Sequence, residues 1–307
     1  AVAFAQLASA GDVIVEPGTY NSPTITITGN DLRIIGSGGR TNDGTQSIID
    51  FSANQSGPGG HLAGFRTTSG VSSLWLRDFV IQGAMQAGMD VEVSKSDIWC
   101  HTVSGPSAVG VRAEDSVLTA IHEVLVNNSG AIGIELHDGN TNRLYYDVTM
   151  NSADAGIMVH GGSDDNSIGV DGPNNVITSG NHGIKLQDSV GNVVKDNQVL
   201  TVNEGNGITV TNAASQNTID NNTVQYVTLG SGILVDNSSG QRVINNDIGN
   251  VHLDGIALTT EDGSMGCTGC MIAMNGVGLA GRAGIALGKN SDSNELLFNQ
   301  IGVSAQG

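Results

Sequence analysis

The chain has 307 residues and is strongly acidic: 12 Lys and Arg stand against 30 Asp and Glu, and the formal net charge is −18. So few basic residues cannot easily form the positive surface that nucleic-acid binding needs, whereas acidity favours solubility or a cationic partner such as calcium. No apolar run approaches the roughly 18 residues that cross a membrane as a helix, so we expect no membrane span.

Residues 1–11 predict a short amphipathic helix, with apolar side chains at Val2, Phe4 and Leu7 and an end at Gly11. Such a helix would cap the open end of the structure that follows. The chain begins with Ala, and no positively charged segment precedes an apolar run. We therefore expect an extracellular or cell-surface protein whose signal peptide is absent or already removed.

Residues 12–87 predict a series of short strands. Alternating apolar residues and turn signals place these strands at 12–16, 24–28, 32–35, 47–51 and 74–81. The stretch 52–60 is rich in Gly, Ser, Asn and Pro, and it predicts a loop.

From residue 88 onward, a Gly followed by alternating apolar residues recurs every 22 to 29 residues. The copies begin at Gly88, Gly110, Gly133, Gly156, Gly183, Gly207, Gly232, Gly255 and Gly284. This period predicts a solenoid with one coil per repeat and about 11 to 12 coils. We expect one β-helix domain over 1–307, with a cap at 1–11, first coils at 12–87 and regular coils at 88–307.

Each Gly-led strand is followed by a second expected strand of the form Asn-x-Val/Ile-x-x-Asn-x-Val, as in 192–199 and 217–224. Asn recurs near its end, at Asn197, Asn222 and Asn246. Asn tolerates the left-handed backbone of a sharp corner, and stacked amides can hydrogen-bond from coil to coil. We interpret these residues as structural ladders.

In each Gly-led strand the first and third residues after Gly should point inward, and the second and fourth outward. Successive coils stack about 4.8 Å apart, so the outward residues should form two columns along the axis. The outward pairs are Asp90/Glu92, Arg112/Glu114, Glu135/His137, Met158/His160, Lys185/Gln187, Thr209/Thr211, Leu234/Asp236, Ala257/Thr259 and Ala286/Gly288.

This organisation resembles the right-handed parallel β-helix, an all-β fold of NosD-like and carbohydrate-acting proteins in the pectate-lyase-like superfamily. The opening Leu7-x-x-Ala-Gly-Asp-x-Ile-Val-x-Pro-Gly-Thr-Tyr20 is similar to the first coil of many polysaccharide lyases and epimerases of this fold. The paired-Asp motifs of polygalacturonases and the Arg-containing motif of pectate lyases are absent. The run 133–138, Gly-Ile-Glu-Leu-His-Asp, resembles the Asp-Pro-His-Glu motif of alginate epimerases after its Gly-aromatic pair. His182, which precedes Gly183-Ile184, resembles their second His.

Ionisable side chains gather in the first five outward pairs. His137 and His160 should be neighbours in one column, and Glu135 should lie two coils from Lys185 in the other. His182 should flank this group. Acid–base chemistry on a uronate needs a base, an acid and a cation that neutralises the carboxylate. The candidate catalytic residues are His137, His182, Glu135 and His160, and the candidate substrate-binding residues are Lys185, Arg112, Glu114, Gln187, Asp138 and Asp188.

The run 161–166, Gly-Gly-Ser-Asp-Asp-Asn, is an acidic loop beside His160. Asp164 and Asp165 are the candidate metal ligands, with calcium as the candidate cofactor, although their spacing matches no complete calcium loop. The pair Cys267 and Cys270 has the spacing of a local disulfide, of buried thiols, or of half a metal or redox site.

The sequence favours an extracellular β-helix that acts on a polysaccharide or cell-surface glycan, as a uronate epimerase or lyase. The alternative is a non-catalytic structural or adhesive solenoid. In that case the ionisable column is an ordinary solvated face, where ion pairs contribute little. No capping segment follows the last expected strand, so the chain is either a fragment or associates with itself through that end.

Overall fold

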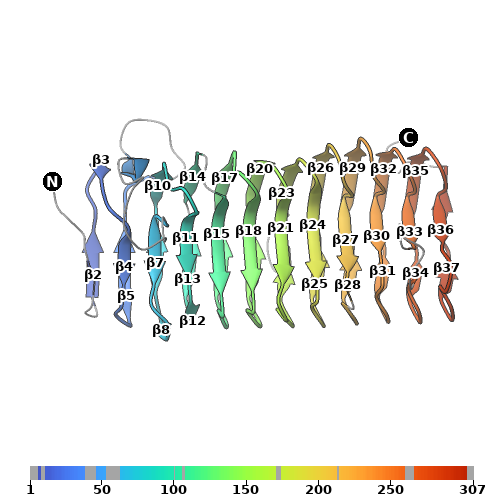
Figure 1. The fold of residues 1–307 in the computed structure, drawn as a ribbon, viewed down its shortest axis with the longest axis horizontal. Coiled ribbons are helices and arrows are strands. Elements are labelled where there is room, and N and C mark those ends of the chain that lie inside the picture. Colours follow the sequence, from blue (N-terminus) through green and yellow to red (C-terminus); the bar gives the residue numbers. More distant parts are fainter. Residues whose placement is uncertain are drawn as a thin grey trace.

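The computed structural model describes residues 6–7, 11–38, 46–52, 63–99, 101–105, 108–170, 174–212, 214–259 and 266–302. The regular secondary structure of these residues consists of β-strands. They form three 12-stranded sheets and one two-stranded sheet, in which every pairing is parallel. The coils follow one another along the long axis of the molecule (Figure 1).

The first long sheet, sheet A, contains the Gly-led strands of the repeat. Its strands are β1 (Gln6–Leu7), β4 (Ile25–Ile27), β7 (Phe65–Thr67), β11 (Ala87–Val91), β15 (Val109–Glu114), β18 (Ile132–His137), β21 (Ala155–His160), β24 (His182–Gln187), β27 (Ile208–Thr211), β30 (Ile233–Val235), β33 (Ile256–Leu258) and β36 (Ile285–Leu287).

Sheet B follows sheet A around one corner of each coil. Its strands are β2 (Gly11–Ile14), β5 (Leu32–Ile35), β9 (Trp75–Arg77), β13 (Asp97–Trp99), β16 (Ala120–His122), β19 (Arg143–Tyr145), β22 (Ser167–Ile168), β25 (Val193–Lys195), β28 (Thr218–Asp220), β31 (Arg242–Ile244), β34 (Met271–Ala273) and β37 (Glu295–Leu297).

Sheet C completes each coil and leads back to sheet A. Its strands are β3 (Gly18–Asn21), β6 (Ser47–Asp50), β10 (Phe79–Gln82), β14 (Thr102–Ser104), β17 (Leu125–Asn127), β20 (Val148–Ser152), β23 (Val176–Ser179), β26 (Gln198–Val202), β29 (Thr223–Val227), β32 (Asp247–Val251), β35 (Gly276–Ala280) and β38 (Gln300–Ile301). The short strands β8 (Val71–Ser72) and β12 (Val93–Ser94) pair at the corner between sheets A and B.

The expected parallel β-helix is confirmed, but each regular coil has three strands rather than the expected two. The stretch 192–199 contains β25 and the start of β26, which are separated by a corner at Asp196, where φ is 59°. The single strand expected at 74–81 likewise divides into β9 and β10 at Asp78, with φ of 65°. At each corner two outward residues stand together, Arg77-Asp78 and Lys195-Asp196, and they interrupt the alternation. No Gly or Pro marks the interruption, so each stretch was predicted as one strand.

The core is a stack of apolar side chains along the axis. Ile134, Ile157 and Ile184 are partners in consecutive strands and are fully buried, as predicted. The inward pairs remain buried as far as Ile256 and Leu258. The last pair departs from the prediction: Leu287 is 50% exposed, because β36 is the last strand of its sheet among the described residues.

The recurring Gly is explained by a close approach between coils. A Cβ on Gly133 would lie 2.5 Å from the carbonyl oxygen of Gly156 in the next coil and 2.8 Å from Thr149 Cγ2. Gly207 meets the same obstacle at Gly232. Any side chain at these positions would push two coils apart, so the repeat keeps Gly there.

Buried amides form ladders at two corners, which confirms the interpretation of the recurring Asn. Asn222, at one corner, is 1% exposed; it donates to the Oδ1 of Asn246 at 3.0 Å, and its own Oδ1 accepts from the backbone N–H of Asn197 at 3.0 Å. A second ladder at the corner after sheet A contains Asn142, Asn166, Asn192, Asn217 and Gln241. Each amide pairs backbone groups that the sharp corner would leave unpaired.

The expected N-terminal helix is not found where the structure describes this segment. Gln6–Leu7 form β1, paired with β4, and Gly11 begins β2; residues 1–5 and 8–10 lie outside the described part of the chain. Most of the loop expected at 52–60 also lies outside it. In the described ranges no helix is long and apolar enough to cross a membrane.

Candidate functional site

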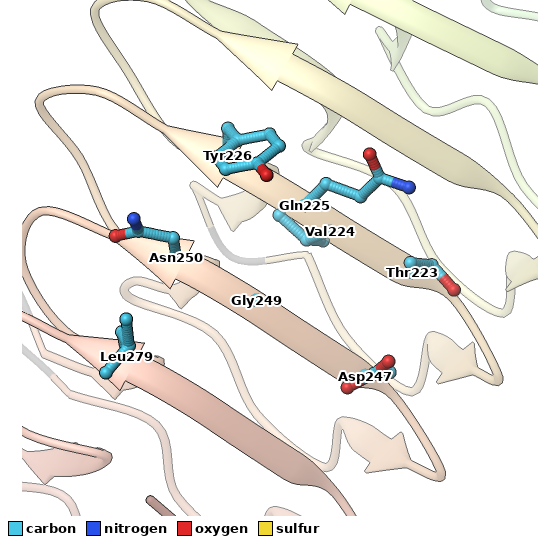
Figure 2. Close-up of a pocket in the computed structure, with 8 residues that line it drawn as sticks. All are labelled: Thr223, Val224, Gln225, Tyr226, Asp247, Gly249, Asn250 and Leu279. Atoms are coloured by element: carbon cyan, nitrogen blue, oxygen red, sulfur yellow. The ribbon is translucent and has the colours of Figure 1, made fainter. Parts of the chain in front are cut away.

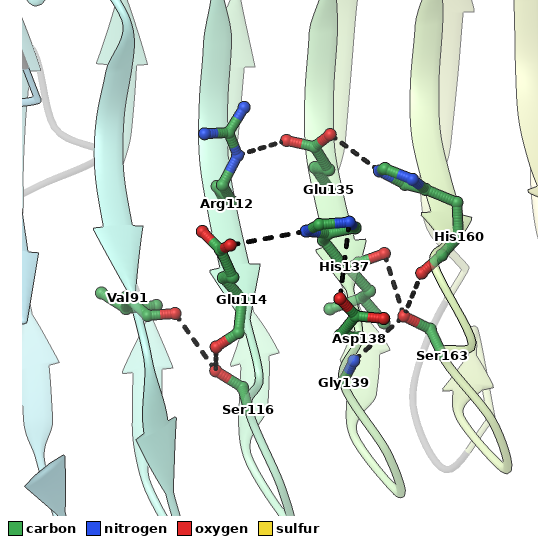
Figure 3. A network of polar contacts seen from close by, with 11 residues as sticks. Val91, Arg112, Glu114, Ser116, Glu135, His137, Asp138, Gly139, His160 and Ser163 are labelled. Carbon is green, nitrogen blue, oxygen red and sulfur yellow. Dashed lines mark hydrogen bonds and ion pairs between the residues drawn. The ribbon is translucent and has the colours of Figure 1, made fainter. Parts of the chain in front are cut away.

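The register of sheet A places the predicted outward residues in two columns. Glu135 on β18 has Arg112 and Met158 as its partners in the flanking coils, and Lys185 follows Met158. In the second column Glu114, His137 and His160 are consecutive partners, as predicted. We call the six residues Arg112, Glu114, Glu135, His137, Asp138 and His160 the histidine patch (Figure 3).

Glu135 is the centre of the histidine patch and is only 5% exposed. Its Oε2 accepts a hydrogen bond from Arg112 Nε at 2.6 Å, and its Oε1 lies 2.9 Å from His160 Nε2. Burial raises the pKa of Glu135, but the hydrogen bonds from His160 and Arg112 outweigh it and hold the pKa below its ordinary value. Glu135 is therefore an ionised carboxylate that fixes both neighbours.

His137 is the more exposed histidine of the patch, with a side chain 34% exposed. Its Nδ1 lies 3.6 Å from Glu114 Oε1, and its Nε2 lies 3.6 Å from Asp138 Oδ2. The imidazole stacks on that of His160, with ring centroids 4.5 Å apart and planes inclined by 29°. Both ring nitrogens face carboxylates at distances that leave room for exchange of a proton with a bound molecule.

The backbone after β21 is shaped around His137. Gly161 has a φ of 71°, and a Cβ on it would lie 2.6 Å from His137 Cδ2 and 2.8 Å from Nε2. Ser163, in the same corner, accepts from the N–H of Gly139 at 3.0 Å and donates to the carbonyl of His160 at 2.6 Å. The two glycines of the run 161–162, which sequence reasoning assigned to an acidic loop, thus let the chain turn closely over the imidazole.

His182 does not join the histidine patch. It pairs with Ala155, and Ala155 lies five residues before His160 on β21, so His182 is about 17 Å along the sheet from the stacked histidines at about 3.3 Å per residue. Its Nδ1 lies 3.0 Å from Thr209 Oγ1 and accepts from the N–H of Asn206 at 3.4 Å. A base role would need a free lone pair, but Nδ1 is occupied and Nε2 carries the proton.

Burial, and secondarily the charge of Lys185, lowers the pKa of His182 to about 4. The imidazole is therefore neutral near pH 7. Lys185 lies between Met158 and Thr209 in its column, so it is two coils from Glu135, as predicted, with Met158 between them. Gln187 and Asp188 lie at the end of β24, where Gln187 Nε2 is 3.5 Å from Asp188 Oδ2. These residues line the same face as the patch but do not contact it.

The candidate metal residues have structural contacts. Asp164 Oδ1 accepts from the N–H of Val190 in the next coil at 2.7 Å, and the N–H of Asp165 donates to the carbonyl of Val190 at 3.0 Å. The described part of the chain contains no group of three or more His, Cys, Asp and Glu side chains that could hold a metal ion. Cys267 and Cys270 form a disulfide, one of the alternatives that the sequence left open.

Sequence reasoning missed a column of rings on sheet B. Trp99, His122 and Tyr145 are consecutive partners on β13, β16 and β19, and their rings stack. The signal was present, because these residues lie 22, 23 and 23 positions apart counted from Arg77, the partner of Trp99 on β9. Only the Gly-led strand was used to build columns, and the same counting on the following strand would have revealed this one.

Three described cavities lie on sheets B and C, and none includes a residue of the histidine patch. One, of about 280 Å³, lies on sheet C and is lined by Tyr226, Gln225, Asp247, Asn250 and neighbouring residues (Figure 2). Its one carboxylate has no base beside it, so it offers contact area rather than acid–base chemistry. The other two cavities adjoin Trp75.

The fold and these surfaces define a parallel β-helix with an ionisable patch on one sheet and rings on another. The model of the NosD family, described as periplasmic copper-binding protein (NosD), matches residues 76–256, and the chain belongs to this family. A comparison with curated protein sequences gave no match.

Solved structures with the same fold include carbohydrate enzymes. The A-module of a mannuronan C-5 epimerase from Azotobacter vinelandii has a TM-score of 0.64 at 14% identity, covering 96% of this chain and 87% of that one. DFA-IIIase from Arthrobacter chlorophenolicus without its lid has a TM-score of 0.63 at 14% identity, covering 94% and 87%. The periplasmic alginate epimerase AlgG has a TM-score of 0.57 at 13% identity, covering 94% and 76%. At these identities the likeness shows the fold.

The family description names copper, but the described side chains do not fit a resident copper ion. His137 and His160 present ring faces rather than lone pairs to each other, and His160 Nε2 is bonded to Glu135. The sulfurs of Cys267 and Cys270 are joined to each other and so are not thiolate ligands.

Proposed function

We propose that this protein binds a polysaccharide along sheet A and modifies uronate residues in it, as an epimerase or a lyase outside the cytoplasm. The observation that carries the proposal is the histidine patch, in which His137 stacks on a histidine that a buried carboxylate holds in place. The printed descriptions of proteins with this fold, two of them alginate or mannuronan epimerases, support a carbohydrate substrate. The family description and AlgG, both periplasmic, support the location.

In this proposal His137 exchanges the proton at C-5 of a uronate. Removal of that proton leaves negative charge on the carboxylate, and a cation beside the carboxylate stabilises it. Arg112 suits this role, because only its Nε is bonded to Glu135 and its terminal nitrogens lie on the far side of that bond (Figure 3). Glu135 and His160 act as positioning residues, since Glu135 is buried and His160 is bonded to it.

The steps after proton removal separate the two reactions. Return of a proton to the opposite face of C-5 inverts the sugar. Cleavage of the C-4–O-4 bond, with a proton delivered to the departing O-4, instead gives an unsaturated uronate and releases the neighbouring sugar as an alcohol. We assign to Lys185, farther along the same face, contact with a second uronate carboxylate of the bound chain.

The test is incubation of the protein in deuterium oxide with mannuronate and polygalacturonate oligomers. Proton NMR should show deuterium incorporation at C-5 or the olefinic signal of an unsaturated product. His137→Asn should reduce the rate by at least about 100-fold, the contribution of one general acid–base group. His252→Asn is the matched control, because His252 is an exposed histidine outside sheet A.

The second candidate is a non-catalytic glycan-binding solenoid. It is favoured by the position of the cavities, which adjoin rings and amides on sheets B and C rather than the histidine patch. Binding of uronate oligomers by the wild type without exchange at C-5 and without unsaturated product would establish this alternative and refute the catalytic one.

A further inference from the structure

Sheet B carries a continuous column of stacked side chains on its outer face. Trp99 and His122 have ring centroids 5.5 Å apart, and His122 and Tyr145 are 4.6 Å apart with planes inclined by 8°. The guanidinium of Arg77 lies 5.0 Å from the centroid of Trp99 and extends the column by one coil. We call this column, together with Trp75 and Arg33, the aromatic surface.

Trp75 is the part of the aromatic surface that stacking does not explain. Its side chain lies in a second outward column, next to the column that contains Trp99. The guanidinium carbon of Arg33 lies 5.3 Å from the centroid of its ring. Trp75 is 42% exposed. A stack that only stabilised the coils would account for Trp99, His122 and Tyr145. It would not account for the exposed ring of Trp75, and Trp is enriched at interfaces because it combines a large apolar face with a polar N–H.

Trp75 separates two cavities that together extend along the axis. One of about 340 Å³ is lined by Arg33, Ile35, Trp75, Arg77 and Trp99. The other, of about 380 Å³, is lined by Trp75, Lys95, Ser96, Asp97, Leu118, Thr119, Ala120, Thr141 and Arg143. They reach from β5 to β19, four strand spacings or about 19 Å, which accommodates a short run of sugar rings.

The lining of these cavities is positive in a chain of net charge −18. It holds four cations, Arg33, Arg77, Lys95 and Arg143, and one carboxylate, Asp97. Outside the lining, Asp12 lies 3.5 Å from Arg33 and Asp78 lies 3.3 Å from Arg77, in partly exposed ion pairs that contribute little and that a ligand carboxylate can replace. Asp97 Oδ1 lies 2.8 Å from His122 Nε2, so this oxygen is turned towards the ring column. Cations beside exposed ring faces suit a ligand that offers apolar C–H surfaces and carboxylates together.

The aromatic surface and the histidine patch share coils and meet at one corner. Asp138 follows His137 at the end of β18, and Thr141, three residues later, lines the larger cavity. Leu118 and Thr119 come from the equivalent corner after β15. The two surfaces therefore lie on adjacent sides of one corner of the solenoid.

We propose that the aromatic surface is a binding site for an acidic polysaccharide, in which a pyranose ring stacks on Trp75 and uronate carboxylates bind Arg77, Lys95 and Arg143. The site is separate from the proton transfer assigned to His137 and does not depend on it. It anchors the anionic chain beside the histidine patch, where carboxylates outnumber cations and attract such a chain poorly.

The test uses the fact that Trp75 and Trp99 are the only two tryptophans of the chain. Intrinsic tryptophan fluorescence therefore reports on this surface alone. The His137→Asn variant, which removes turnover, is titrated with a β-1,4-mannuronate hexamer and with the β-1,4-mannose hexamer, its neutral counterpart. We expect a saturable change in emission with the mannuronate hexamer and at least tenfold weaker binding of the mannose hexamer.

Variants in the same background assign the contacts. Trp75→Ala should weaken mannuronate binding at least tenfold, read from the emission of Trp99, whereas Trp75→Phe should retain most of it. Lys95→Gln, which changes an exposed corner side chain and leaves the ring column intact, should weaken mannuronate binding several-fold. Phe298→Ala, at an 84% exposed ring just after β37 and outside the described cavities, is the matched control and should have no effect.

Three results would overturn the inference: no saturable change in emission, equal affinity for the two hexamers, or unchanged binding by both Trp75→Ala and Lys95→Gln. Proton exchange at C-5 is measured separately with wild-type protein. If the wild type binds mannuronate as expected but catalyses no exchange at C-5 and forms no unsaturated product, the proposed function is refuted and the binding site is supported. Failure of the proposed function is therefore distinguishable from failure of the binding site.

Discussion

The substitution Glu135→Gln removes the negative charge at the centre of the histidine patch with little change of volume. A hydrogen bond to a charged group contributes about 1.5–3 kcal/mol, and Glu135 makes one to Arg112 and one to His160. The Arg112 side chain is 33% exposed and that of His160 21%, so both can turn partly to water. A glutamine oxygen can still accept one bond. We therefore expect a loss of about 2–3 kcal/mol in local stability.

The loss should depend on pH in a defined direction. The pKa of Glu135 is lower in the folded protein than in the unfolded chain, so its ionisation stabilises the fold above the unfolded pKa of about 4.3. This contribution disappears as the pH falls through the lowered folded pKa. The difference between wild type and Glu135→Gln should thus be largest near neutral pH and shrink in acid.

Native-state hydrogen exchange measures this effect locally, which matters because long solenoids need not unfold in one step. Amides of β15, β18 and β21 should lose protection in the variant, whereas those of β32 and β35 should not. Glu92→Gln is the matched control, since the Glu92 side chain makes no ion pair or side-chain hydrogen bond with the described residues. Equal losses at neutral and acid pH, or none at all, would refute the assigned role of the carboxylate.

Three further results are expected. Asn222→Ala leaves buried backbone groups of its ladder unpaired and should lower the free energy of unfolding by about 2–5 kcal/mol in urea denaturation; a loss below about 1 kcal/mol contradicts the ladder. The ring protons of His182 should titrate near pH 4 by NMR, and stability should fall as the pH drops from about 6.5 towards 4, because the unfolded chain takes up the proton first; His182→Gln should remove this dependence. Gly161→Ala places a Cβ against His137 at a φ of 71° and should reduce turnover and lower the melting temperature, whereas unchanged turnover would show that the His137 position is not critical.

Much of the fold could be predicted because one short pattern repeats. The alternation after each Gly predicts which side chains point inward, and the regular period predicts that His137 lies beside His160, as the structure confirms. The three-strand coil could not be predicted in the same way. Its extra corner is marked only by two adjacent outward residues, such as Arg77 and Asp78, and Asp78 adopts positive φ without a Gly or Pro to signal a turn.

For the candidate site, the sequence predicted which residues share a column but not which side chains are bonded to each other. Counting residues brought Glu135 into line with Arg112 and placed Met158 between Glu135 and Lys185, yet only the structure shows that Glu135 bonds His160 across the columns. His182 shows the other limit. Its position along the strand could have been counted, but its bonds to Thr209 and Asn206 depend on a side-chain orientation that the repeat does not specify.

The stacking of coils also determines which residues a bound polymer would protect. A polymer lying parallel to the long axis crosses each coil once, so it touches short segments separated by one repeat of 22 to 29 residues. Protection from a protease or a labelling reagent would then appear as evenly spaced bands in the sequence. A ligand wrapped around a single coil would instead protect one continuous stretch, so the spacing of the bands alone reveals the direction in which the polymer lies.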